Sequence, residues 1–217
     1  MDRNEYLVAI RALIGVYKNQ QDMAYFDGHL PRFNAQLDMF DEFLAKESIK
    51  SVIDFGTDIP YTSFYFALTQ NAQVNLGCVH TPGEAQLADN VFRSYVNLNF
   101  PNWKNRGNSD LVICTECLEH LPTNLYKVRA ALCETVKDGG FLLLSFPLNG
   151  MNAKDYGLDL GHIDHNAGHE HIREFTEQTA REFYAGTGFS LVCERITWTN
   201  AYGGNIMNVL LKKDVFA

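Results

Sequence analysis

Two glutamates and a histidine occur close together after an apolar run. Glu116, Glu119 and His120 are spaced i, i+3 and i+4, directly after the run Asp110–Cys114. If this stretch turns helically, the three side chains project from one face and lie within reach of a single ion. Two carboxylates and imidazole nitrogens suit Mg²⁺, Mn²⁺, Fe²⁺ or Zn²⁺. The spacing predicts a divalent-metal site, and a bound divalent ion can lower the pKa of a hydroxyl group that it coordinates.

A histidine-rich segment at residues 149–172 offers a further metal donor. Its four histidines, spaced two to four residues apart, are His162, His165, His169 and His171. Any of them could complete the ligand set, and the competing interpretation is that they are surface residues of a polar loop.

The elements that must hold these side chains follow from apolar periodicity. Helical spacing predicts helices over residues 4–18 and 33–44, with Asp27–Pro31 breaking the pattern between them. Short apolar runs alternating with helical stretches then predict a doubly wound, mostly parallel sheet. The expected strands are residues 51–56, 73–79, 94–98, 110–114, 141–146, 189–198 and 205–212, and the expected helices among them are 62–70, 82–92, 125–136 and 176–185.

The last two expected strands are joined by a short glycine-containing segment, which predicts a hairpin with one antiparallel strand. We therefore expect an α/β, Rossmann-like fold with a seven-stranded sheet and an antiparallel C-terminal edge hairpin. Residues 1–47 are expected to form an N-terminal helical cap, and residues 48–217 the Rossmann-like domain.

Composition and charge limit the class of protein. The 217 residues are 46% hydrophobic and 20% charged, which excludes disordered, collagen-like and coiled-coil chains. A net charge of −8 argues against nucleic acid and anionic membranes as partners. The N-terminal residues do not resemble a signal peptide, and the five cysteines are expected to be reduced, so we expect a cytoplasmic protein. Cys114 and Cys117 have the spacing of a redox or zinc pair, but no second pair accompanies them.

The order of elements and four short motifs resemble the class I S-adenosylmethionine-dependent methyltransferases. The motifs are the first-strand loop Val52–Gly56, the fourth-strand segment Asp110–Pro122, the turn and strand Val136–Pro147, and the segment His171–Thr176. The resemblance implies an S-adenosylmethionine cofactor and an acceptor bound over the carboxyl ends of the strands, beneath the N-terminal helices.

The resemblance also carries over a set of cofactor contacts. They are Asp54, Gly56, Asp58, His80 and Asn97, with Asn99 as the alternative to Asn97 for the missing adenine-side acid. The family's glycine loop D-x-G-x-G-x-G is degenerate, because Asp58 and Pro60 replace its second and third glycines. His80 stands where a ribose-binding acid is usual. In the helix that follows the loop, Tyr61 is the aromatic residue expected to meet a ligand.

Within the superfamily, the E-x-x-E-H pattern with a later histidine resembles the small-RNA 2′-O-methyltransferases and the ubiquinone-pathway O-methyltransferases. In those families it holds a divalent metal that binds two neighbouring acceptor oxygens. The resemblance assigns as metal ligands Glu116, Glu119, His120 and His171. His120 and His171 are also the catalytic candidates, and His169 is an outer-shell candidate. Other relatives carry a similar pattern without metal, which is the competing interpretation.

We therefore expect O-methylation of a small hydroxylated acceptor such as a catechol, a sugar or a glycan end. The N-terminal helices could cover the site or pair two subunits. The degenerate glycine loop supports an alternative function, a methyltransferase-like binding protein that has lost normal cofactor binding. The absence of a dinucleotide glycine fingerprint argues against an NAD-dependent enzyme.

Overall fold

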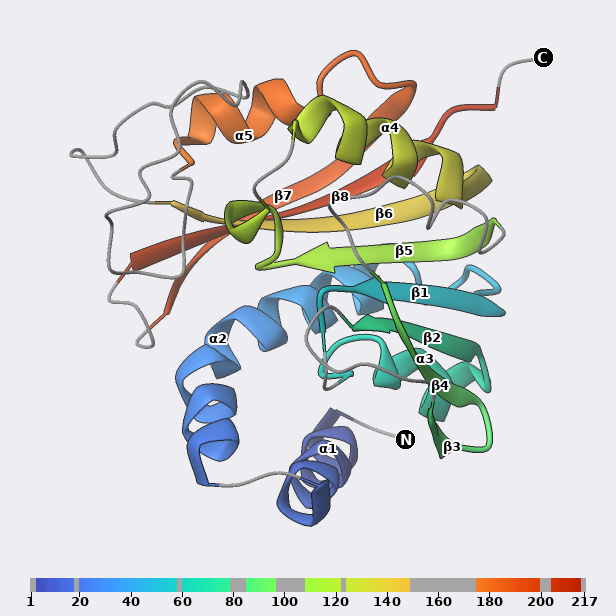
Figure 1. Ribbon diagram of the computed structural model, residues 1–217, viewed down its shortest axis with the longest axis vertical. Coiled ribbons are helices and arrows are strands. Elements are labelled where there is room, and N and C mark those ends of the chain that lie inside the picture. The colour runs from blue at the N-terminus through green and yellow to red at the C-terminus, as the bar shows by residue number, and fades with distance from the viewer. Residues whose placement is uncertain are drawn as a thin grey trace.

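The computed structural model describes residues 3–17, 20–57, 60–78, 85–96, 108–121, 124–148, 175–199 and 204–215 (Figure 1). Its elements in chain order are α1 (Arg3–Tyr17), α2 (Gln20–Phe43), β1 (Ser51–Phe55), α3 (Phe64–Gln70), β2 (Gln73–Cys78), β3 (Ala85–Ala88), β4 (Val91–Tyr95), β5 (Ser109–Thr115), η2 (Leu118–His120), α4 (Leu125–Thr135), β6 (Val136–Leu148), α5 (Glu177–Tyr184), β7 (Phe189–Thr199) and β8 (Gly204–Lys213).

One sheet runs through the molecule, with its strands in the order β3-β4-β2-β1-β5-β6-β8-β7. The five central strands are parallel, whereas β8 is antiparallel to both β6 and β7. The predicted parallel sheet with an antiparallel C-terminal hairpin is confirmed. The predicted count of seven strands is wrong, because β3 adds an eighth strand antiparallel to β4.

The helix predicted over residues 82–92 is wrong. Ala85–Ala88 have fair helix propensity, but in the structure they form β3. A turn then reverses the chain into β4, and Asn90 fixes that turn. Its side-chain amide donates hydrogen bonds to the backbone oxygens of Ala67 and Ala72, at 3.1 and 2.9 Å. These tertiary bonds favour a hairpin over a local helix.

The predicted break at Asp27–Pro31 is also wrong, because α2 begins at Gln20 and passes through Pro31. Proline removes one helical hydrogen bond, which costs about 3 kcal/mol in a helix interior. Buried aromatic side chains on both sides of it, Phe26 and Phe33, offset this cost. Each contributes about 1.5–3 kcal/mol when removed from water. The longer helix extends over the carboxyl ends of the strands.

Different helices cover the two faces of the sheet: α4 and α5 lie on one, and α1, α2 and α3 on the other (Figure 1). Side chains of β1 alternate between these two cores. Phe55 packs on the α4–α5 side and Val52 on the α2–α3 side, so Asp54 faces α2 and α3. Cap and sheet thus share a core, and the division at residue 47 stays a prediction. None of the helices in the described ranges is long and apolar enough to cross a membrane.

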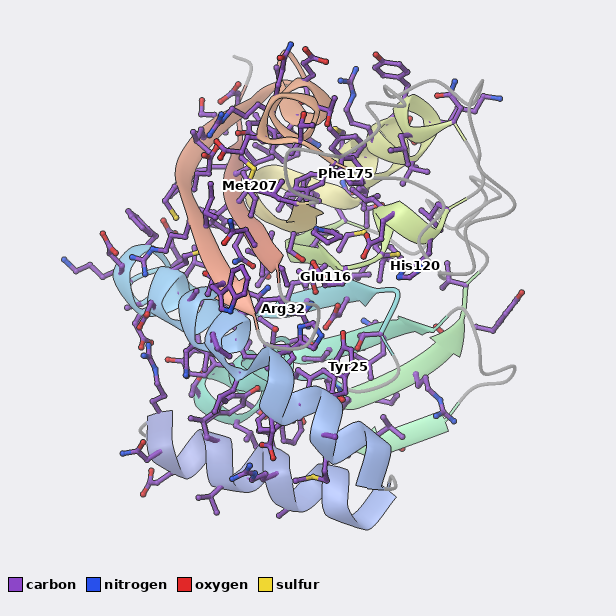
Figure 2. All side chains as sticks on the ribbon, turned by 90° about the vertical axis from the view of Figure 1, so that its left-hand side faces the viewer. Tyr25, Arg32, Glu116, His120, Phe175 and Met207 are labelled. Atoms are coloured by element: carbon purple, nitrogen blue, oxygen red, sulfur yellow. The ribbon has the colours of Figure 1, made fainter. Side chains whose placement is uncertain are left out.

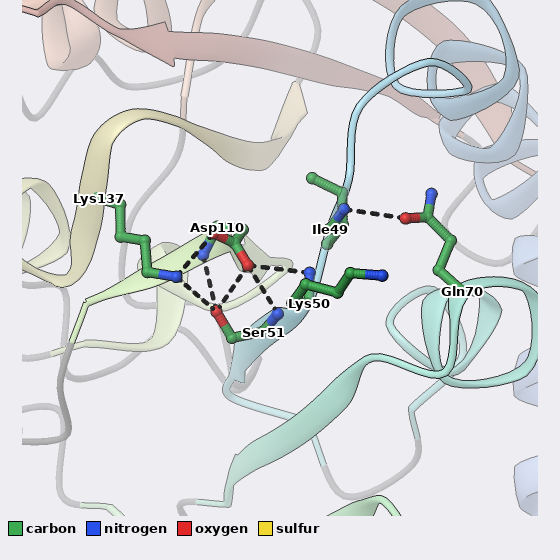
Figure 3. A network of polar contacts seen from close by, with 6 residues as sticks. All are labelled: Ile49, Lys50, Ser51, Gln70, Asp110 and Lys137. Atoms are coloured by element: carbon green, nitrogen blue, oxygen red, sulfur yellow. Dashed lines mark hydrogen bonds and ion pairs between the residues drawn. The ribbon is translucent and has the colours of Figure 1, made fainter.

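A polar network joins the amino ends of β1, β5 and β6 (Figure 3). Asp110 Oδ2 accepts hydrogen bonds from the backbone N–H groups of Lys50 and Ser51, both at 2.9 Å. Asp110 Oδ1 accepts one from Lys137 Nζ at 2.8 Å. The network fixes the register of three strands whose opposite ends carry the polar side chains described below.

Replacing Asp110 by asparagine should lower the free energy of unfolding by about 1–3 kcal/mol at pH 7, because charged hydrogen bonds are lost. Burial raises the pKa of Asp110, but hydrogen bonds from Lys137, Lys50 and Ser51 outweigh burial and hold it below its usual value. Such a carboxylate stabilises the fold above its unfolded-state pKa, and this contribution is lost as pH falls through the folded-state pKa. The difference between the proteins should therefore shrink on acidification below about pH 4.

Urea unfolding at pH 7 and at pH 3 measures this difference. The exposed Asp89→Asn is the matched control and should change stability little at either pH. An equal loss for Asp110→Asn at both pH values would contradict the network's role.

Candidate functional site

A pocket of about 60 Å³ lies between α2 and the carboxyl ends of β1 and β5. Figure 2 looks onto this end of the sheet, where Tyr25 and Arg32 of α2 follow one another toward Glu116. Ligands of doubly wound folds bind at the carboxyl ends of the strands, so this pocket is the candidate site. Its lining includes Tyr25, Arg32, Phe33, Asp54, Gly56 and Glu116.

Glu116 joins the end of β5 to both β6 and α2. Its positive φ of 50° turns the chain sharply after the strand. Oε1 accepts a hydrogen bond from Ser145 Oγ at 2.8 Å, and the Glu116 N–H donates to the same hydroxyl oxygen at 2.9 Å. Oε2 lies 3.5 Å from Arg32 Nη1, yet it is buried and accepts no hydrogen bond. The ion pair is therefore longer than a direct charged hydrogen bond, which is about 2.7–2.9 Å.

Burial dominates the electrostatics of the pocket. The side chains of Arg32 and Glu116 are 3% and 5% exposed. Burial raises the pKa of Glu116, although the charge of Arg32 and the Ser145 hydrogen bond oppose this. Asp54 is also buried and accepts a hydrogen bond from Ser63 Oγ at 2.7 Å. Burial raises the pKa of Asp54 to about 7, against the Ser63 hydrogen bond and the Arg32 charge.

The pocket thus places two carboxyl groups near one guanidinium. A ligand that brings a positive group can pair with Asp54 or Glu116, while Arg32 can bind a negative group.

The predicted helical cluster of Glu116, Glu119 and His120 is wrong. The chain forms only the single 3-10 turn η2, and Glu116 lies before it at positive φ. Glu119 is fully buried and neither of its oxygens accepts a side-chain hydrogen bond. Its Oε1 lies 3.6 Å from His120 Nε2, whereas Glu116 is turned toward Arg32.

The described residues therefore do not fit a divalent metal. In the ranges that the structure covers, no three histidine, cysteine, aspartate or glutamate side chains form a group that could hold one. The predicted ligand His171 and the outer-shell candidate His169 lie outside those ranges. Cys114 and Cys117 are buried free thiols.

Two of the five predicted cofactor contacts, Asp54 and Gly56, line the pocket, as does Tyr61. The other three, Asp58, His80 and Asn97, lie outside the described residues, so their roles stay predictions.

Gly56 is required by a close approach. Its φ is +83°, and a Cβ added there would lie 2.6 Å from Cys117 Sγ. Its N–H donates to the Gly77 backbone oxygen at 2.9 Å, which fixes the loop at the end of β1. The loop after β1 is thus pressed against the segment after β5, and no side chain fits between them.

Sequence reasoning expected the N-terminal helices above the site but missed the pocket side chains Tyr25 and Arg32, because the second helix was expected to begin only at residue 33. A readable signal was present in the spacing of its polar residues. His29, Arg32 and Gln36 recur at i, i+3 and i+7, and all three are buried. Gln36 donates to Asn208 Oδ1 at 2.8 Å and accepts from Thr62 Oγ1 at 2.7 Å. Polar side chains on a buried helix face indicate specific partners.

Comparison with known proteins identifies the family. A family model described as "Methyltransferase domain" matches residues 26–194, which is most of the chain. The chain therefore belongs to this methyltransferase family. No curated protein sequence matches it.

Solved methyltransferase structures share the fold. The 1,6-didemethyltoxoflavin N1-methyltransferase of Burkholderia thailandensis, with 1,6-didemethyltoxoflavin and S-adenosylhomocysteine bound, has a TM-score of 0.68 and 16% identity, over 99% of this chain and 92% of that one. Magnesium protoporphyrin IX methyltransferase from Synechocystis PCC 6803, with S-adenosylhomocysteine bound, has a TM-score of 0.61 and 16% identity, over 90% and 88%. An O-methyltransferase family protein from Burkholderia thailandensis has a TM-score of 0.61 and 14% identity, over 89% and 60%.

We predicted a class I S-adenosylmethionine-dependent methyltransferase, an enzyme with a Rossmann-like fold. The family match and the shared fold confirm this prediction. The resemblance to the small-RNA and ubiquinone-pathway types is not confirmed, because the matching family model is described only as a methyltransferase domain.

Gly56→Ala should destabilise the protein more than Gly186→Ala does. Both glycines have positive φ, which costs alanine about 1–2 kcal/mol. A Cβ at Gly186 meets nothing within 4 Å, whereas one at Gly56 meets Cys117. The clash should add about 1–3 kcal/mol of overpacking. Denaturant unfolding of both variants measures the difference, and equal losses would contradict the close approach.

Asp54→Asn should stabilise the free protein at pH 8 and have little effect at pH 4. The folded-state pKa of about 7 lies above the unfolded-state value, so the native protein holds an extra proton between them. Its stability therefore falls as pH rises from about 4 to about 7 and then levels off. Asparagine removes this loss while keeping an acceptor for Ser63.

Thermal unfolding from pH 4 to pH 8 measures whether the stabilisation by Asp54→Asn increases with pH. Asp89→Asn is the exposed control. A stabilisation that is the same at both ends of this range would show that Asp54 is ionised in the folded protein throughout.

Proposed function

We propose that this protein transfers the methyl group of S-adenosylmethionine to a hydroxyl oxygen of a small acceptor bound beneath α2. The observation that carries the proposal is the pocket in which the buried guanidinium of Arg32 faces the carboxyl groups of Asp54 and Glu116. Membership of the methyltransferase family supports the reaction class. Two proteins of the same fold hold S-adenosylhomocysteine.

The charges of the pocket match the amino-acid end of this cofactor, which carries one carboxylate and one ammonium group. Arg32 can bind the carboxylate through its fork of N–H donors. Glu116 Oε2, which accepts no hydrogen bond in the free protein, and Asp54 can accept from the ammonium group. The cofactor's positive sulfonium would also be favoured by two neighbouring carboxyl groups.

When bound, the cofactor supplies an electrophilic methyl group, and the protein's part is to position the acceptor and exclude water. Phe33 and Tyr61, whose rings stack with centroids 4.8 Å apart, form an apolar wall of the pocket. The Arg32–Glu116 pair ties α2 to the end of β5 and so keeps this wall over the site.

His120 and His171 remain our proposed catalytic residues, which would accept the proton of the acceptor hydroxyl. The His120 side chain is 35% exposed, and the Glu119 carboxylate lies beside its Nε2. No step is assigned to a divalent metal, because the described residues gather no ligand group for one.

A small hydroxylated acceptor, such as a catechol or a sugar, suits a protein of net charge −8 better than a nucleic acid does. The neighbour from Burkholderia thailandensis also binds a small molecule, 1,6-didemethyltoxoflavin. Assembly through the N-terminal helices and a cytoplasmic location remain part of the proposal.

S-adenosylhomocysteine should bind the purified protein, and a concentration 100 times its dissociation constant should add about 2.7 kcal/mol to stability. Arg32→Gln should weaken this binding about 10- to 100-fold, because one charged hydrogen-bonding partner is lost. Calorimetry measures the affinity. Arg195→Gln, which removes an ion pair with Asp38 and Glu42 on the same helix, should leave it unchanged.

Since Arg32→Gln leaves Glu116 buried without its ion-pair partner, the double variant Arg32→Met with Glu116→Gln provides a second test in a neutral background. It should fold and still bind weakly. No binding of S-adenosylhomocysteine by the unmodified protein at millimolar concentration would overturn the proposed function and favour the non-catalytic binding protein.

A further inference from the structure

Ring side chains form a continuous set along the α2 side of the pocket. The centroids of Tyr25 and His29 are 4.2 Å apart, and those of Tyr25 and Tyr61 are 6.0 Å apart. Phe26 and Phe33 stack on Tyr61 at 5.7 and 4.8 Å. Phe26, His29 and Phe33 are buried, whereas Tyr25 is 36% exposed and also lines the pocket. Tyr61 also lines the pocket and is half-buried, so Tyr25 is the most exposed ring of this set.

His29 gives Tyr25 a firm support. It is fully buried on α2, one helical turn from Tyr25. Burial, helped by the nearby charge of Arg32, lowers the pKa of His29 to about 3, so its ring is neutral at working pH. A neutral aromatic ring at 4.2 Å, tilted by 37°, holds the tyrosine ring in place by packing rather than by charge.

Tyr25 and Arg32 face the same pocket from one helix (Figure 2). They are seven residues apart, which is two helical turns or about 10 Å. A molecule that stacks on Tyr25 is therefore separate from a carboxylate held by Arg32, yet it lies in the same pocket.

We propose that Tyr25, supported by His29 and Tyr61, is the stacking surface for the methyl acceptor, and that the acceptor is a planar hydroxylated aromatic ring rather than a sugar. This inference rests on the proposed function of the pocket and narrows its substrate class. Aromatic rings pair in offset or tilted arrangements with centroids 4.5–7 Å apart, and a saturated ring lacks the flat π face that such pairing requires. Tyr25 is a specificity-determining residue and takes no part in the chemistry.

The test compares catechol with cis-cyclohexane-1,2-diol, which have the same number of heavy atoms and the same two hydroxyl groups. Binding of each probe to protein saturated with S-adenosylhomocysteine is measured by NMR titration. Catechol should bind about 10-fold more tightly. Equal binding of the two probes, or no catechol binding up to its solubility limit, would overturn the inference.

Variants at Tyr25 then locate the stacking. Tyr25→Phe keeps the ring and should keep catechol affinity within about twofold, whereas Tyr25→Leu should lose about 3- to 10-fold. Tyr126→Leu is the matched control, because Tyr126 is a similarly exposed tyrosine on α4, on the opposite face of the sheet. Tyr126→Leu should leave the affinity for catechol unchanged.

The affinity for S-adenosylhomocysteine, measured in parallel, separates the two proposals. If Tyr25→Leu weakens S-adenosylhomocysteine and leaves catechol unchanged, Tyr25 stacks on the cofactor's adenine and the inference is wrong. If the unmodified protein binds S-adenosylhomocysteine but Tyr25→Leu binds catechol as tightly as the unmodified protein does, the inference about Tyr25 is wrong and the proposed function still stands. If S-adenosylhomocysteine does not bind the unmodified protein, the proposed function fails first.

Discussion

Burial of opposite charges at the carboxyl ends of the strands is the constraint on which the architecture depends. Asp54, Glu116 and Glu119 are all nearly inaccessible to water, and burial raises the pKa of each. Among the described residues that line the pocket, Arg32 is the positive group that compensates them. Removing charges from water costs several kcal/mol per ion, so such a cluster stabilises a fold poorly. Its retention is better explained by ligand binding than by stability.

This constraint accounts for the form of α2. The helix continues through Pro31 despite the cost, and its residue Arg32 pairs with Glu116. Gln36, one turn further on, anchors the helix through Asn208 of β8 and Thr62, and these buried hydrogen bonds fix its rotation. With rotation fixed, Arg32 and Tyr25 must face the pocket. The residue that anchors α2 and the residues that line the pocket therefore lie along one face of the helix.

The sequence allowed the fold to be predicted more fully than the site. Buried strands such as 110–114 and the hairpin after Phe189 have strong periodic signals, because packing on both faces demands apolar residues. The segment 82–92 was misassigned because its strand pairing depends on Asn90 reaching Ala67 and Ala72, contacts that no local pattern encodes. Glu116 was found from its motif, but its partner Arg32 lies 84 positions earlier and only the fold brings them together.

The Arg32–Glu116 pair also determines which ligands can enter at low energetic cost. A simple anion that took Arg32 would leave Glu116 buried and unpaired, and breaking a buried pair in this way costs about 3–5 kcal/mol. A simple cation bound to Glu116 would in turn leave the guanidinium of Arg32 buried without its carboxylate partner. An amino-acid head group avoids both costs, because its carboxylate replaces Glu116 at Arg32 while its ammonium group replaces Arg32 at Glu116. The 3.5 Å separation and the open acceptor position on Oε2 are what such an exchange requires. The same two side chains that join α2 to the end of β5 in the free protein are therefore the ones that we propose bind the two charges of the cofactor.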